Sequence, residues 1–86
     1  MTTVNDVQNN PKFQLIQSSE DFRYLLESLG CPRKTINEEI DNYGLAEYDN
    51  SGELIAVWST CGVPYLENPI YRIFPNWPTI KNLLKR

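Results

Sequence analysis

Histidine is absent from this chain of 86 residues. A Ser-His-Asp or Cys-His nucleophile pair, a histidine general base and a histidine-ligated metal site all need that side chain. The chain therefore cannot build any of these sites alone. We expect no enzymatic activity, no cofactor and no metal ion, and the composition favours a binding protein.

Cysteine is scarce, and long apolar runs are missing. The only cysteines are Cys31 and Cys61, and the first residues lack the basic and apolar regions of an export signal. We therefore expect a cytoplasmic protein in which both thiols are reduced and serve as small buried hydrophobic residues. The longest apolar runs are only a few residues, too short to span a membrane, so no membrane contact is expected.

Acidic residues are absent after Glu67. The whole chain has a formal net charge of −3, but residues 1–67 contain all 11 acidic residues and only four of the eight basic ones. The remaining segment holds four basic residues and no acidic one. An acidic body and a basic, aromatic-rich tail present two different faces to partners, unless the tail docks on the chain's own acidic body.

The length and composition fit one small domain with a modest core, since 41% of the residues are hydrophobic and 12% are aromatic. Residues 1–11 are rich in Asn and Gln and end at Pro11, which predicts a flexible N-terminal arm that contributes little core. Residues 12–86 are predicted to form a single small α+β domain. Within it, residues 12–16 alternate in polarity and are expected to add a short strand to a later sheet.

A first helix is predicted after Ser18, which suits the cap position because a serine hydroxyl accepts from the free N–H groups of the first turn. Its apolar stripe has the spacing i, i+3, i+4 and i+7, and it consists of Phe22, Leu25, Leu26 and Leu29. Gly30 follows the stripe and supplies a left-handed stop.

A second helix is predicted to begin between Pro32 and Thr35, because Thr35 and Glu38 have the spacing of a capping box. We expect Ile36, Ile40 and Tyr43 to form its buried face, and Gly44 to close it. The two helices then make a helical hairpin.

The following segments predict strands. Residues 45–49 and 53–58 flank an Asn-Ser-Gly turn and indicate a β-hairpin. Residues 59–67 are expected to be a loop, and residues 69–74 a further short strand stopped by Pro75. A C-terminal helix is predicted after Pro78. The predicted fold is therefore α+β, with the helical hairpin followed by the β-hairpin, one further short strand and a C-terminal helix.

Residues 25–45 contain Leu-Gly at 29–30, Thr-Ile at 35–36 and Tyr-Gly at 43–44. This run resembles the helix-turn-helix of Fis-type and excisionase-like DNA-binding domains. The resemblance implies that the second helix lies in the major groove, that the hairpin of residues 45–58 is the wing of a winged helix, and that DNA is contacted by Arg33, Lys34 and Asn37.

The exposed positions of that second helix depart from the family's pattern. Where bases and phosphates would be contacted, this chain has acidic residues, and negative charge opposes the electrostatic attraction that provides most DNA affinity. We therefore expect a protein partner first, with nucleic acid as the alternative.

Two features indicate the binding surface. The acidic second helix suits a basic partner, and Tyr, Trp and Arg in the tail are the residue types that dominate binding hot spots. The predicted partner-binding residues are Glu38, Glu39, Asp41, Tyr71, Arg72 and Trp77. The sequence thus predicts a small non-enzymatic regulatory or inhibitory protein. The alternative is a winged helix-turn-helix transcriptional regulator or an excisionase-like protein.

Overall fold

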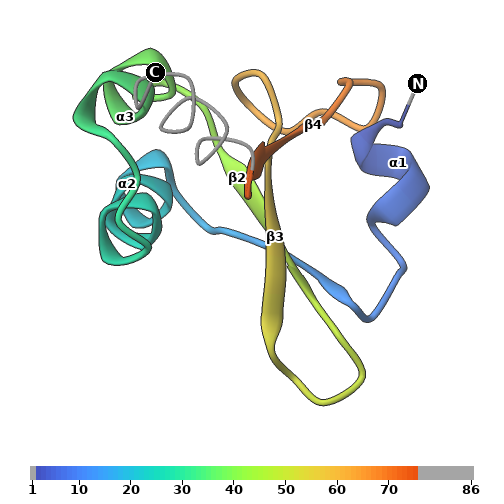
Figure 1. Cartoon of the computed structure of the whole chain (residues 1–86). Helices are drawn as coiled ribbons and strands as arrows, with labels where there is room; N and C mark the ends of the chain where they lie inside the picture. The colour runs from blue at the N-terminus through green and yellow to red at the C-terminus, as the bar shows by residue number, and fades with distance from the viewer. Residues whose placement is uncertain (1, 76–86) are drawn as a thin grey trace, which may run out of the picture.

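A four-stranded antiparallel sheet forms the centre of the protein in the computed structural model, which describes residues 2–75. Its strands are adjacent in chain order and comprise β1 (Phe13–Leu15), β2 (Gly44–Tyr48), β3 (Leu54–Ser59) and β4 (Tyr71–Phe74). The helices are α1 (Val4–Val7), α2 (Ser19–Ser28) and α3 (Arg33–Glu38). Helices α2 and α3 lie on one side of the sheet and α1 lies on the other (Figure 1).

The mixed α+β class is confirmed, as are β1, the β-hairpin and the strand after residue 69. The order of elements differs from the predicted one, because the unpredicted helix α1 precedes β1 and the helical hairpin. The predicted C-terminal helix lies outside the described residues, and so does Trp77.

The segment before residue 12 contributes to the core, so the expectation that it would not was wrong. Val4 and Val7 of α1 are buried and form a second apolar cluster with Leu45 and Ile70. The backbone N–H of Ile70 donates to the carbonyl of Thr2 at 2.9 Å. Only two apolar residues carry this packing inside a polar sequence, which is why composition alone indicated an arm.

Helix α2 follows the predicted pattern. The hydroxyl of Ser18 accepts from the backbone N–H of Asp21 at 3.1 Å, and Gly30 has the left-handed φ of +79° that ends the helix. Phe22 and Leu26 are completely buried because the apolar stripe faces the sheet. The first core cluster consists of Phe22, Leu26, Cys31, Ile36, Val57 and Ile73.

Helix α3 begins as predicted but is shorter. It starts at Arg33 and ends at Glu38, well before Tyr43, and Thr35 lies inside it rather than at a cap. The backbone N–H of Glu39 is shared between the carbonyls of Thr35 and Ile36, which tightens and ends the last turn.

The buried face after α3 is also different from the prediction. Ile36 is buried as expected, but Ile40 is 41% exposed and Glu39 is only 6% exposed. Hydrogen-bond donors around its carboxylate compensate for this burial, as described below. The prediction assigned Ile40 to the core because it assumed that the helical spacing continued beyond Glu38.

Gly44 opens β2 and does not cap a helix. A Cβ atom at this position would overlap the ring of Phe22 and would lie 3.0 Å from Cδ1 of Ile16. The glycine is therefore needed for the close approach of β2 to α2, not for a positive φ.

Candidate functional site

The end of α3 and strand β4 meet in a polar cluster. The hydroxyl of Tyr71 donates to Oε2 of Glu39 at 2.8 Å, and Nδ2 of Asn42 donates to Oε1 of the same carboxylate at 2.9 Å. Glu39 and Tyr71 were predicted from separate segments, and the structure joins them. Because these bonds occupy both oxygens of the Glu39 carboxylate, it stabilises the fold where we expected it to face a partner.

Two further groups next to Glu39 have perturbed acidity. Burial, and then the hydrogen bond and charge of Glu39, raise the pKa of Tyr71 to about 12, against a lowering effect of the Ser59 hydroxyl. Partial desolvation of the sulfur and the charge of Glu39 also raise the pKa of the Cys61 thiol. Cys31 is buried as predicted, whereas Cys61 is exposed, which corrects that expectation. The raised pKa keeps the Cys61 thiol protonated at neutral pH and therefore weakly nucleophilic.

Arg72 lies on the opposite face of the sheet from Tyr71, because successive residues of a strand point to opposite faces. Its guanidinium is 5.6 Å from the centroid of the Trp58 ring, which is within the range of a cation–π contact. Nε1 of Trp58 donates to Oε1 of Glu47 at 3.1 Å. The structure thus separates Arg72 from the acidic residues with which the sequence grouped it.

The remaining predicted residues are exposed on or just after α3. Glu38 and Asp41 were assigned to a protein partner, whereas Arg33, Lys34 and Asn37 were assigned to DNA. Both sets therefore occupy one short segment of the surface, and Ile36 is the only buried residue within α3. Charges of both signs lie close together there, so the two predicted sites are not separate surfaces.

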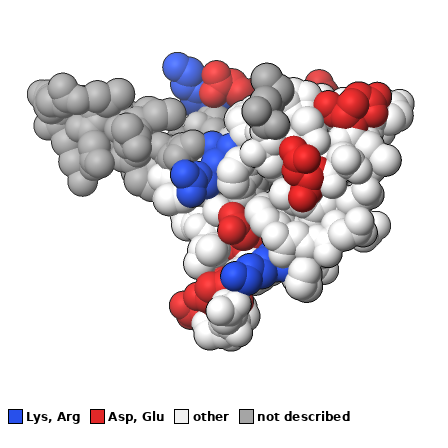
Figure 2. Space-filling model, turned by 90° about the vertical axis from the view of Figure 1, so that its right-hand side faces the viewer, with Lys and Arg blue, Asp and Glu red and all other residues white. Residues whose placement is uncertain are grey.

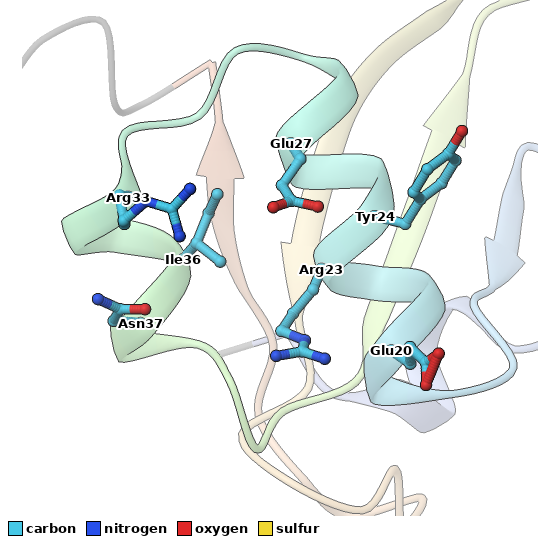
Figure 3. Close-up of a pocket in the computed structure, with 7 residues that line it drawn as sticks. All are labelled: Glu20, Arg23, Tyr24, Glu27, Arg33, Ile36 and Asn37. Atoms are coloured by element: carbon cyan, nitrogen blue, oxygen red, sulfur yellow. The ribbon is translucent and has the colours of Figure 1, made fainter.

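A groove lies between α2 and α3, with a volume of about 230 Å³. Figure 3 shows Arg33 extending from α3 toward α2, where the carboxylate of Glu27 faces the same space. The groove is lined by Glu20, Arg23, Tyr24, Glu27, Arg33, Ile36 and Asn37. It therefore combines two guanidinium groups, two carboxylates and one amide, and Tyr24 lies at its α2 rim with the ring directed away from α3 (Figure 3).

The α2 side of this groove was missed by the sequence analysis. Glu20, Arg23, Tyr24 and Glu27 have the spacing i, i+3, i+4 and i+7, which places them along one stripe of the helix. That spacing is visible in the sequence, but only the apolar stripe of this helix was interpreted, and its polar stripe was not. The phenol of Tyr24 is the most notable member, because 74% of this residue is exposed.

Residues 2–75 contain no group of three or more His, Cys, Asp or Glu side chains able to hold a metal ion. No helix within these residues is long and apolar enough to cross a bilayer. The groove's mixed charges suit a polar peptide or protein surface better than an apolar small molecule.

Comparisons with protein-family models, with curated proteins and with solved structures find no match to this chain.

Proposed function

We propose that this chain is a small non-enzymatic regulatory or inhibitory protein that acts by binding another protein through the groove between α2 and α3 and the acidic residues at the end of α3. The observation that carries this proposal is the groove that holds Arg23 and Arg33, with Tyr24, which is 74% exposed, on its α2 rim. Tyr and Arg are enriched among binding hot spots because they provide a large contact area and several hydrogen bonds. Tyr24 contributes little to this protein's own core.

The charge pattern favours a protein over a polyanion as the partner. Arg33 in the groove accompanies Glu20 and Glu27, and Glu38 and Asp41 are exposed nearby. A duplex carries roughly one negative charge per 1.7 Å of its axis, so these carboxylates would be repelled. A protein surface can offer both signs of charge and so pair with both sets of residues.

The way α3 is held also supports recognition. Ile36 fixes the helix to the core cluster, and the bond between Tyr71 and Glu39 fixes its end to β4. The exposed side chains are thereby presented on a positioned backbone, which reduces the entropy lost on binding. Arg72, on the other face of the sheet, does not belong to this contact.

The test begins with affinity capture from the native host, with nuclease treatment and identification of the captured protein. Binding of that protein is then measured by calorimetry for Tyr24→Ala and Arg33→Ala, and we expect each to weaken binding by about 2 kcal/mol. Two matched controls are Tyr65→Ala, a tyrosine that is 60% exposed outside the groove, and Lys34→Ala, an exposed cation that does not line it. Equal effects of targets and controls would contradict the proposed site.

A second candidate, a winged helix-turn-helix regulator, is favoured by the exposure of Arg33, Lys34 and Asn37 on α3. The two proposals differ in their dependence on Lys34. Phosphate binding should weaken with either cation removed, whereas the groove contact needs only Arg33. Titration of random-sequence and native upstream DNA at low salt separates them, since sub-micromolar affinity that falls in both variants would support the DNA regulator.

A further inference from the structure

An apolar pocket lies on the α1 side of the sheet, opposite the side that carries α2, α3 and the groove between them. It has a volume of about 210 Å³ and is lined by Val4, Val7, Gln8, Phe13, Leu15, Leu45, Pro64 and Leu66. Two of these residues are large and exposed, namely Leu15 at 38% and Leu66 at 49%. Figure 2 shows this side of the molecule, where most of the surface is uncharged and charged side chains are scattered. The pocket therefore offers an apolar lining with access from solvent.

The edge of the sheet runs along the same pocket. Strand β1 pairs with β2, and the bonds to β2 involve the carbonyl of Lys12 and the N–H of Ile16. Because bonding directions alternate along an antiparallel strand, the N–H and carbonyl of Leu15 point away from β2. Among residues 2–75, neither group of Leu15 has a hydrogen-bond partner. The outward-facing N–H and carbonyl of Leu15 can therefore pair with one residue of an added main chain.

We propose that the edge of β1 and the apolar pocket together bind an extended peptide segment of a partner protein. The backbone groups of Leu15 require an extended main chain, and alternate side chains of that strand point to the face that holds the pocket. One large aliphatic or aromatic side chain of the peptide fills the pocket between Leu15 and Leu66. This surface is independent of the groove and does not rest on the function proposed above.

The charge around the pocket specifies the peptide further. Asp6 on α1 and Glu67 are both exposed, and the exposed Lys12 directly precedes β1. Glu67 lines a second hollow that adjoins the pocket at Leu66. A Lys or Arg next to the apolar anchor would complement these carboxylates. A second copy of this chain fits less well, because it would bring the same acidic residues together.

The experiment selects displayed random octapeptides on the full chain. We expect enriched sequences with one large apolar residue and a neighbouring Lys or Arg. A synthetic version of the best sequence should bind about tenfold more weakly to Leu66→Ser and to Leu15→Pro, which removes an edge N–H. The matched control is Val63→Ser, because Val63 is 54% exposed but does not line the pocket, and its affinity should stay unchanged. Tyr24→Ala should also leave the affinity unchanged, which separates this test from that of the groove.

A peptide that is N-methylated at its anchor residue tests the strand pairing without changing the protein. We expect a loss of about tenfold, because the methyl group blocks one main-chain hydrogen bond. This measurement remains decisive if Leu15→Pro fails to fold. The proposal is overturned if no peptide is enriched, or if the selected peptides bind Leu66→Ser and Val63→Ser equally. A dimer in sedimentation that Leu15→Pro abolishes would instead assign the edge to a second copy.

Discussion

The hydroxyl of Tyr71 on β4 donates a 2.8 Å hydrogen bond to the carboxylate of Glu39, the residue directly after α3. These two residues are 32 positions apart in the chain, so the bond ties the helical side of the protein to the last described strand. Glu39 is 6% exposed, and its neighbour Ile40 is 41% exposed. The polar residue thus occupies the buried position, and the apolar residue faces solvent.

This arrangement gives the first prediction. Glu39→Ala removes the acceptor of Tyr71 and Asn42 and should lower the free energy of unfolding by about 1 to 3 kcal/mol. Ile40→Ala should cost less than about 1 kcal/mol, because its side chain is already partly in water. Urea denaturation measures both, with Glu38→Ala as the control for loss of an exposed carboxylate. A larger cost for Ile40→Ala would show that the buried face is that of a longer helix.

The pKa of Tyr71 gives a pH-dependent prediction. Its folded pKa of about 12 lies above the usual tyrosine pKa of 10.0, so the folded state keeps a proton that the unfolded state releases. The stability from this residue is therefore complete below pH 10 and is lost as the pH rises toward 12. Tyr71→Phe has no such group, and its unfolding free energy should fall less over that window. Parallel curves for the two proteins between pH 9 and 11 would contradict the raised pKa.

Local patterns in the sequence predicted much of this fold. The serine cap and apolar stripe of α2, the turn at residues 50–52 and the strand near Ile73 depend on neighbours in the chain, and all are confirmed. The burial of Glu39 after α3 depends on its bond to Tyr71, which lies 32 positions later in the chain, and no local signal marks that contact. No local signal explains Gly44 either, because a side chain there is excluded by the ring of Phe22, which lies 22 positions earlier in the chain.

The candidate site was only partly accessible to sequence reasoning. Arg33 and Asn37 were identified because they follow a helix-turn-helix pattern, and the groove includes both. Tyr24 was not identified, because its exposure depends on which face of α2 is covered by the sheet. The sequence analysis placed Arg72 in one binding surface with the acidic residues. Side chains alternate between the two faces of β4, so Arg72 lies on the face opposite Tyr71, against Trp58.

The N-terminal segment should be part of the folded core. Val7→Ala removes two buried methyl groups from the cluster with Leu45 and Ile70, and it should cost about 1 to 3 kcal/mol. The adjacent Gln8→Ala is the control, because Gln8 is exposed and should change stability by less than about 0.5 kcal/mol. Thermal and urea unfolding give the comparison. Equal stability of the two variants would show that residues 1–11 are an arm after all.

The packing of Gly44 against Phe22 can be tested by a coupled pair of substitutions. Gly44→Ala adds a methyl group that overlaps ring atoms of Phe22, and it should destabilise the protein by about 1 to 3 kcal/mol. Phe22→Leu alone should also be destabilising, as a change in a fully buried side chain. The double variant should be more stable than the sum of the two losses, because the smaller side chain makes room for the methyl group. Strict additivity in a double-mutant cycle would show that the two positions are not in contact.

The two thiols should differ in reactivity, because Cys31 is buried and Cys61 is exposed. The native protein should therefore react with one equivalent of a disulfide reagent, and Cys61→Ser should abolish that reaction. Partial desolvation of the sulfur and the charge of Glu39 raise the pKa of Cys61 above its usual value of 9.0, so less thiolate is present at pH 8 than in free cysteine. The rate should be correspondingly slow and should rise steeply between pH 8 and 10.

The effect of the Glu39 charge on this rate can be tested separately. Glu39→Gln removes the charge but not the desolvation of the thiol, so we expect the reaction rate of Cys61 to increase by only about a few-fold. Glu38→Gln changes an exposed carboxylate outside this cluster and should leave the rate as it is. Two reacting thiols, or a rate at pH 8 above that of free cysteine, would contradict this assignment of the two cysteines.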